Sequence, residues 1–237
     1  MDDELDFIKK NWEKVKERIE KTALRVGRNP EEIEVVAVSK GFPSTYIRKA
    51  YEVGIRKIGE NRVQEAEKKI SELTRDLECE WHLVGHLQTN KVKKALKLFD
   101  LIHSLDRLDL ANAINKEAQR ENKVVRVLIQ LNLSGEKTKY GFKEDEFWKA
   151  LNELLSYEYL KIEGLMTIGP LTTNKDEIRK VFRNLYNIWE VLRVKENLDL
   201  RYLSMGMSED FEIAIEEGSN LLRLGRIIFS KEFEVRG

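Results

Sequence analysis

Short apolar runs alternate with amphipathic stretches along almost the whole chain. Eight runs have the length of strands, and several are rich in β-branched residues without strict polar alternation, as is typical of parallel strands buried on both faces. These predicted strands are Val35–Ser39, Ile55–Gly59, Trp81–Gly85, Leu101–Leu105, Val124–Leu133, Ile162–Ile168, Tyr202–Met207 and Leu221–Phe229.

Apolar residues also recur at helical spacing before and between these runs. The first such stretch, Asp6–Arg25, precedes the first strand, and Gly27 favours the end of this helix just after Arg25. Seven further amphipathic stretches separate the eight strands: Ser44–Val53, Val63–Leu73, Lys91–Leu98, Leu108–Glu121, Asp145–Leu155, Asp176–Val194 and Glu209–Glu217.

This order of elements favours an α/β fold, a single (β/α)8 TIM barrel with an extra N-terminal helix that covers the open gap. An open, doubly wound sheet is the alternative. The 237 residues suit one barrel, for which roughly 250 residues are typical. No linker or composition break marks a second domain, so we expect residues 1–237 to form one domain.

Composition and charge narrow the class of protein. The 42 basic and 42 acidic residues cancel, so no net field favours nucleic acid or an anionic membrane. No apolar run approaches the ~20 residues of a membrane span. The acidic N-terminus, Met1-Asp2-Asp3-Glu4, does not resemble a targeting segment, and a lone Cys79 fits a reducing compartment. We expect a cytoplasmic protein.

A barrel collects its chemistry on the loops at the C-terminal ends of its strands. The first predicted strand ends in Val38-Ser39-Lys40-Gly41, which places a lysine at the mouth. A lysine partly desolvated there would have a lowered amine pKa, as Schiff-base chemistry with an aldehyde requires. A surface lysine at a strand end is the simpler interpretation of position alone.

The last two predicted strands carry candidates for a phosphate site. Barrels commonly bind phosphate with the loops after strands seven and eight. Ser208 is a hydroxyl donor at the predicted start of the following helix, and Gly225 would let backbone amides approach a phosphate, although either residue is also an ordinary cap or turn residue. The segment 54–59 has P-loop spacing, but Glu60 stands where that motif needs lysine.

Two histidines lie in the third predicted strand, and neither indicates a metal. His82 and His86 are four residues apart, which spans roughly 13 Å in a strand, so they cannot share an ion. The sequence has no HExxH motif and no cysteine ligand set. A buried histidine satisfied by hydrogen bonds is the default interpretation of each.

Seven sequence blocks, in order along the chain, resemble the pyridoxal phosphate homeostasis protein family, also called proline synthase co-transcribed homologues, whose barrel is of the alanine racemase N-terminal-domain type. The blocks are VAVSK at 36–40, IGENRVQE at 58–65, WHLVGHLQTNK at 81–91, SGEKTKYGF at 134–142, EGLMTIG at 163–169, LSMGMSED at 203–210 and RLGRIIF at 223–229. They extend over nearly the whole chain. The chain departs from the usual pattern at two positions. Arg62 stands where an aromatic residue is common, and Ser230 stands where a glycine often follows the IIF segment.

The resemblance implies a binding site for pyridoxal 5′-phosphate (PLP). It implies a Schiff base on Lys40 and a phosphate held by Ser208 and Gly225. It places Arg223 near the pyridine nitrogen, where a permanent positive charge disfavours protonation and weakens the ring as an electron sink. Four more residues of this chain resemble those that line the cofactor in such barrels: Asn61, His82, Met166 and Ser204.

The family implies a protein that binds, buffers and delivers PLP without substrate turnover, with PLP-requiring apoenzymes as candidate recipients. A barrel without the racemase's second domain lacks the usual contacts of the racemase dimer, so we expect a monomer. Alanine racemases take a catalytic tyrosine from a second domain, whereas this chain ends eight residues after Phe229. We therefore expect the second base to be missing. A small PLP-dependent racemase or related enzyme, with Tyr140, His82 or Lys139 as that base, is the alternative. A regulatory barrel without the cofactor is a third possibility. Lys139, in the loop after the fifth strand, is also a candidate for cofactor transfer, or an ordinary loop lysine.

Overall fold

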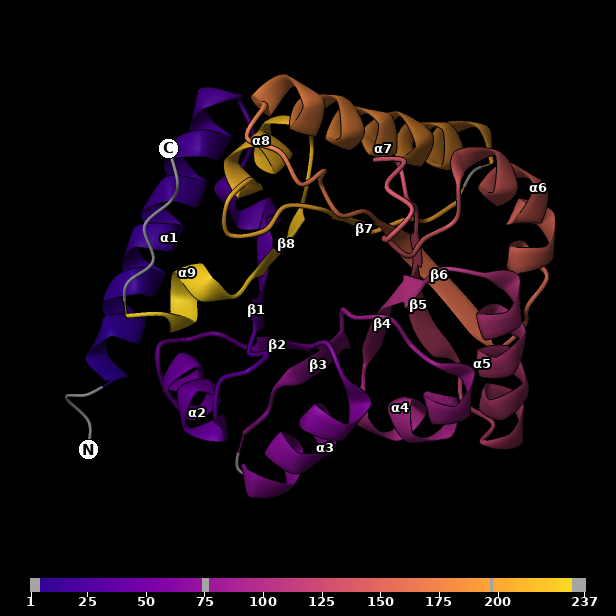
Figure 1. The fold of residues 1–237 in the computed structure, drawn as a ribbon, viewed down its shortest axis with the longest axis horizontal. Coiled ribbons are helices and arrows are strands. Elements are labelled where there is room, and N and C mark those ends of the chain that lie inside the picture. Colours follow the sequence, from indigo (N-terminus) through magenta and orange to yellow (C-terminus); the bar gives the residue numbers. More distant parts are fainter. Residues whose placement is uncertain (1–4, 74–76, 197, 232–237) are drawn as a thin grey trace.

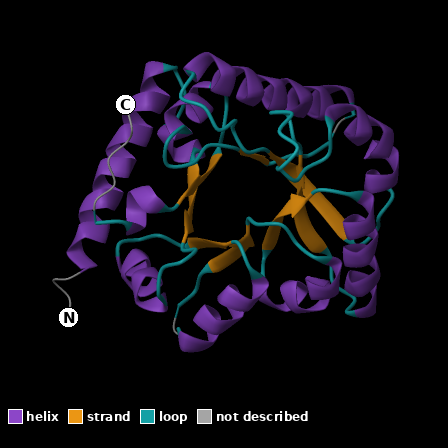
Figure 2. Cartoon of the chain, viewed as in Figure 1, coloured by secondary structure: helices purple, strands orange, loops and turns teal. Residues whose placement is uncertain are grey.

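Eight parallel strands close into a barrel in sequence order in the computed structural model, which describes residues 5–73, 77–196 and 198–231 (Figures 1 and 2). The last strand pairs with the first, with Val36 opposite Arg223. The barrel predicted from the sequence is therefore confirmed, and the open sheet is wrong. The strands are β1 (Glu34–Val38), β2 (Lys57–Glu60), β3 (Glu80–Leu83), β4 (Leu101–Leu105), β5 (Val125–Gln130), β6 (Leu160–Met166), β7 (Tyr202–Ser204) and β8 (Leu221–Leu224).

Helices surround the barrel on its outside (Figure 2). The helix at the N-terminus, α1 (Asp6–Arg25), has the bounds predicted from its apolar spacing and packs against α2, α8 and the last helix, α9. The helices between the strands are α2 (Ser44–Glu52), α3 (Val63–Glu72), α4 (Val92–Leu98), α5 (Leu108–Arg120), α6 (Glu144–Leu155), α7 (Lys175–Lys195) and α8 (Phe211–Glu216). Two short 3-10 helices, η2 (Pro30–Glu32) and η3 (Thr89–Lys91), were not predicted. No helix in the described part of the chain combines the length and apolar character of a membrane span.

The run Leu221–Phe229 is not one strand, as its apolar character had predicted. The strand ends at Leu224, and Arg226–Phe229 forms the short helix α9. The amides of Ile228 and Phe229 both donate to the carbonyl of Gly225, which turns the chain out of the sheet. Phe229 is buried because it packs on Phe42, with ring centroids 5.4 Å apart, and a strand is not needed to explain its apolar character.

Two layers of side chains fill the barrel. The lower layer is apolar and comes from six different strands: Val36, Leu101, Leu128, Met166, Tyr202 and Leu221. Because strand side chains alternate between faces, the residues two positions later also point inward, one layer nearer the C-terminal mouth. On three of these strands those residues are His103, Ser204 and Arg223, all fully or almost fully buried. Gln130 adds a fourth polar side chain, whereas Val38 and Ile168 are apolar, so the layer beneath the mouth is mainly polar.

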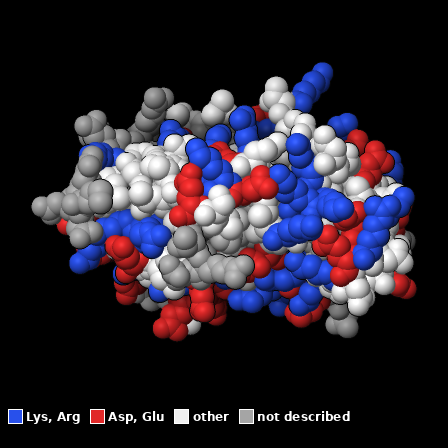
Figure 3. Space-filling view, turned by 90° about the horizontal axis from the view of Figure 1, so that it is seen from below, with Lys and Arg blue, Asp and Glu red and all other residues white. Residues whose placement is uncertain are grey.

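A network of alternating charges closes the opposite, N-terminal end of the barrel. Lys57 lies 3.3 Å from Glu34 and also pairs with Glu80, while Arg126 lies 2.8 Å from the carboxylates of both Glu80 and Glu163. Networks of this kind are worth more than isolated surface pairs. The outer surface seen from below in Figure 3 likewise intersperses basic and acidic side chains.

Candidate functional site

The lysine predicted to carry the chemistry lies in a tight turn directly after β1. The amide of Phe42 donates to the carbonyl of Ser39 at 2.9 Å, which makes Lys40 and Gly41 the two central residues of a β-turn. Gly41 has φ +79°, the left-handed value that the second central residue of a type II turn requires. Lys40 is exposed, and the partial burial expected from the sequence was wrong because this turn lifts the residue out of the sheet.

A buried cluster beyond β1 holds the backbone on both sides of Lys40. Lys69 of α3 donates three hydrogen bonds from Nζ: to the carbonyl of Ser39 at 2.7 Å, to Glu60 at 2.6 Å and to Glu65 at 2.8 Å. The Ser39 hydroxyl donates to Glu60, and the Gly41 amide donates to Glu65 at 2.7 Å. The backbone before and after Lys40 is thus fixed, while no described residue forms a hydrogen bond or ion pair with its side chain.

The two acids of this cluster respond in opposite ways to their surroundings. Burial raises the pKa of Glu60, although hydrogen bonds from Lys69 and Ser39 act against it. The hydrogen bonds that Glu65 receives from Lys69 and from the Gly41 amide lower its pKa in spite of partial burial. Glu60 Oε2 is buried and accepts no hydrogen bond from the described residues.

Arg223 is the buried cation of the polar layer. Its Nη1 donates to Ser204 Oγ at 2.7 Å, and its Nη2 donates to the carbonyl of Thr167 at 2.8 Å. Burial lowers the pKa of Arg223 to about 10, so the guanidinium is still charged at neutral pH. No carboxylate of the described residues lies within ion-pair distance of it, although the charge of Asp210 opposes the lowering of its pKa.

Two buried histidines extend the contacts of Arg223 across the barrel. His103 Nδ1 lies 3.1 Å from Ser204 Oγ, and His103 Nε2 lies 2.9 Å from His82 Nδ1. His82 Nε2 lies 3.3 Å from Glu80 Oε1, outside good hydrogen-bond geometry. Burial lowers the pKa of both rings, that of His103 well below 6.5. Both histidines are therefore neutral at physiological pH.

The candidate phosphate residues come together from β7 and β8. Ser208 is buried, and its hydroxyl oxygen accepts from the Ile227 amide at 3.3 Å, two residues beyond Gly225. The expectation that Ser208 begins the next helix was wrong. Asp210 accepts from the Met207 amide at 2.6 Å, which closes a turn and delays α8 until Phe211.

Backbones approach closely where these loops meet. A Cβ atom on Gly225 would lie 3.0 Å from the carbonyl oxygen of Val38, so β8 packs tightly on the strand that leads to Lys40. A Cβ atom on Gly85 would lie 2.3 Å from the carbonyl oxygen of Asn61. Asn61 is half-buried after β2, whereas Met166 lies in the apolar layer.

The three residues considered as a second base lie in different settings. His82 is fully buried inside the barrel, where its ring contacts that of His103. Lys139 donates to the carbonyl of Gly169 at 2.6 Å and pairs with Glu136 at 2.7 Å. Tyr140 is exposed and stacks on His86, with ring centroids 3.7 Å apart. Within the described ranges no cluster of three metal-ligating side chains occurs.

Several residues that the structure joins to these candidates were not predicted from the sequence. They are His103, Thr167, Asp210 and the acid and lysine cluster Glu60, Glu65 and Lys69. One signal was available for His103, because a histidine two residues after the inward-facing Leu101 must point into the barrel. The cluster around Lys69 had no comparable signal, since its contacts join residues 30 positions apart.

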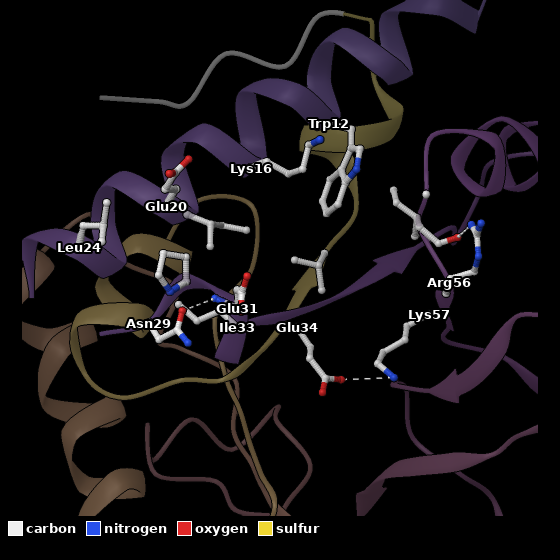
Figure 4. A pocket seen from close by; sticks show the side chains of 15 residues that line it. Trp12, Lys16, Glu20, Leu24, Asn29, Glu31, Ile33, Glu34, Arg56 and Lys57 are labelled. Atoms are coloured by element: carbon white, nitrogen blue, oxygen red, sulfur yellow. Dashed lines mark hydrogen bonds and ion pairs between the residues drawn. The ribbon is translucent and has the colours of Figure 1, made fainter. Parts of the chain in front are cut away.

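A hollow of about 690 Å³ lies at the other end of the barrel, between α1 and the start of β1 (Figure 4). Trp12, Lys16, Glu20 and Leu24 of α1 line one side, and Glu34 and Lys57 lie across from them. Ligand sites of barrels lie at the C-terminal ends of the strands. We therefore assign the candidate site to the mouth around Lys40.

The residues at the mouth fit a phosphorylated, aldehyde-bearing heterocycle. A lysine amine without a partner among the described residues can attack an aldehyde, and a buried guanidinium can donate to a ring nitrogen. A buried serine hydroxyl and a glycine at close backbone approach suit a phosphate. The tight contact of Gly225 with Val38 leaves no room there for a side chain.

The fold and this mouth define an alanine-racemase-type barrel. The family model described as alanine racemase, N-terminal domain, matches residues 4–232. The alanine racemase of Clostridium difficile 630 shares the fold, with a TM-score of 0.73 and 19% identity over 97% of this chain and 58% of its own.

Closer relatives identify the particular family. The pyridoxal phosphate homeostasis protein of Aquifex aeolicus is 43% identical over 92% of this chain and 95% of its own. PipY of Synechococcus elongatus, solved with PLP bound, is 35% identical, with a TM-score of 0.81, over 91% of this chain and 100% of its own. The chain belongs to the pyridoxal phosphate homeostasis protein family, as its seven sequence blocks predicted.

Proposed function

We propose that this protein binds PLP at the C-terminal mouth of its barrel and serves in PLP homeostasis. The observation that carries the proposal is the turn at Lys40: its backbone is held by Lys69 and Glu65, while no described residue forms a hydrogen bond or ion pair with its side chain. A binder of an aldehyde needs such an amine in a fixed place. The PLP bound in PipY, a relative of similar length, supports the assignment.

Each residue of the mouth has a distinct part in this proposal. PLP would supply an aldehyde, with which the Lys40 amine would condense to a Schiff base with loss of water. Ser208 and the backbone at Gly225 hold the phosphate, and Arg223 faces the ring nitrogen. Asn61 and Met166 border the ring from β2 and β6, and His82 and Ser204 act from inside the barrel.

We further propose that the protein holds and releases the cofactor without substrate turnover. Arg223 remains charged at neutral pH and so disfavours a proton on the ring nitrogen, which weakens the ring as an electron sink. PLP-requiring apoenzymes in the cytosol are the recipients in this proposal. The 237 residues act as one domain and as a monomer, which a light-scattering mass measurement tests.

A racemase or related PLP enzyme is the competing function. It would need a second base on the opposite face of the ligand. Lys139 is held by Glu136 and the Gly169 carbonyl, and Tyr140 stacks on His86, so each has another structural part. Exchange of the α-proton of added amino acids with solvent would support the enzyme and contradict the carrier.

The experiment that tests PLP binding compares wild type with Lys40→Ala. We expect only the wild type to develop the absorbance of a protonated Schiff base with PLP. Borohydride reduction followed by peptide mass mapping should then place the adduct on Lys40. Lys68, an exposed lysine on α3, is a matched control, and Lys68→Ala should behave as wild type. Adducts scattered over surface lysines would contradict the proposal.

A further inference from the structure

Arg223 is a buried cation that lacks an ion-pair partner among the described residues, which calls for a physical explanation. Its side chain is 4% exposed, and it donates hydrogen bonds to the neutral Ser204 hydroxyl and the Thr167 carbonyl. Burying an unpaired charge is costly unless oriented dipoles compensate for the lost water.

Only one direction of the hydrogen bonds beyond Arg223 gives every buried proton an acceptor. Arginine is solely a donor, so Ser204 Oγ accepts from Nη1. The hydroxyl proton of Ser204 then has His103 Nδ1, at 3.1 Å, as its acceptor among the described residues. A neutral His103 therefore carries its proton on Nε2 and donates it to His82 Nδ1 at 2.9 Å.

The last step of this sequence ends at a carboxylate. With Nδ1 as acceptor, a neutral His82 carries its proton on Nε2, which faces Glu80 Oε1 at 3.3 Å. The contact with His82 lowers the pKa of Glu80, as do Lys57 and Arg126, so this carboxylate is ionised. The charged groups around the two rings are Glu80 of β3, Lys57 of β2, Arg126 of β5 and Arg223 of β8.

We propose that Ser204, His103 and His82 are positioning residues that form a one-way hydrogen-bond chain, which begins at Arg223 and ends at His82, whose Nε2 faces the Glu80 carboxylate at 3.3 Å. Every dipole of this chain presents its negative end to Arg223, and successive hydrogen bonds polarise one another. The chain stabilises the guanidinium without a carboxylate in direct contact with it, because Asp210, the acid whose charge acts on Arg223, lies beyond ion-pair distance. The full charge of Arg223 is thereby left to act on the ring nitrogen of the ligand, an effect that rests on the proposed function.

The chain itself is tested without any ligand. Nitrogen-15 spectra of the imidazole rings at pH 7.5 should show His82 and His103 neutral with the proton on Nε2. Ser204→Ala should abolish the tautomer preference of His103. Ser104→Ala is the matched control, because Ser104 is the adjacent buried hydroxyl and its Oγ has no partner in the described structure. A proton on His103 Nδ1 in the wild type, or an unchanged His103 in Ser204→Ala, would overturn the chain.

The effect on the ligand is tested with PLP and its 1-deaza analogue, in which C–H replaces the ring nitrogen. We expect Ser204→Ala to raise the Kd of PLP about tenfold, which corresponds to the loss of one hydrogen bond to a charged group. The Kd of the analogue should be unchanged. An equal loss for both ligands would overturn the positioning role. If the wild type fails to bind PLP while the tautomers are as expected, the proposed function fails and the chain stands.

Discussion

The ammonium nitrogen of Lys69 lies 2.7 Å from the carbonyl oxygen of Ser39, the residue directly before Lys40. This one side chain joins α3 to the turn of the proposed cofactor lysine, and its other two hydrogen bonds reach Glu60 and Glu65. Three donors and three acceptors satisfy the ammonium group completely. The turn is therefore held in place before any ligand arrives.

Replacing Lys69 by methionine should destabilise the protein strongly. Removing one member of a buried ion pair leaves the other charge uncompensated, which costs about 3–5 kcal/mol of the free energy of unfolding. Glu60 is completely buried, and Lys69 is 5% exposed. Urea unfolding without ligand measures the loss. Lys68→Met is the control, because the neighbouring Lys68 side chain is 78% exposed and pairs with Glu72 only at 3.9 Å. Equal stability of the two variants would contradict the role of Lys69.

Ser208→Ala should weaken the binding of PLP but not that of pyridoxal, which lacks the phosphate. Ser208 is buried next to the Ile227 amide, and a hydrogen bond to a charged phosphate is worth about 1.5–3 kcal/mol, or a roughly tenfold or greater rise in Kd. Absorbance titrations with both ligands measure the difference. A similar loss for pyridoxal would show that Ser208 supports the fold and does not contact the phosphate.

The arrangement of strands and helices was predictable because each element has a local signal. Buried parallel strands appear in the sequence as apolar runs, and α1 appears as apolar residues at helical spacing. The prediction of one strand over Leu221–Phe229 was wrong because an apolar run does not distinguish a strand from a buried helix. Its second half became α9 through contacts such as that between Phe229 and Phe42, which lie far apart in the sequence.

The site was predictable only where residues occupy strand ends or match a family block. Lys40, Ser208 and Arg223 were proposed in this way. His103 lies 101 positions from Ser204, and their contact exists only because the barrel closes. The exposure of Lys40 was also beyond sequence reasoning, since it depends on the turn that Gly41 permits and Lys69 holds.

The stability of the protein without ligand should fall as the pH drops from 7.5 to 5.5. The pKa values of His82 and His103 are lowered in the folded state, mainly by burial, so below pH 6.5 the unfolded chain binds protons that the folded chain does not. Their contribution is present above pH 6.5 and is lost as the pH falls. Each histidine can contribute up to about 1.4 kcal/mol per pH unit.

His103→Gln provides the comparison for this pH dependence. The variant should be less stable than wild type at pH 7.5, and its stability should fall less steeply between pH 6.5 and 5.5, by up to about 1.4 kcal/mol per pH unit. Burial raises the pKa of Glu60 and Asp210, which contribute with the opposite sign, and these contributions cancel between the two proteins. Parallel stability curves from urea unfolding would contradict a neutral, buried His103.

Gly85→Ala should disturb both stability and PLP binding, because its Cβ atom would lie 2.3 Å from the carbonyl oxygen and 2.8 Å from the Cα atom of Asn61. Backbone must move to relieve this clash, at a cost of about 1–3 kcal/mol, and Asn61 moves with it. Gly54→Ala is the control: its Cβ atom meets nothing within 4 Å, and its φ of +97° costs only about 1–2 kcal/mol of backbone strain. Urea unfolding should therefore show both variants destabilised, whereas only Gly85→Ala should raise the Kd of PLP. If Gly85→Ala binds PLP as wild type does, Asn61 does not line the cofactor, since the substitution must displace the backbone that carries it.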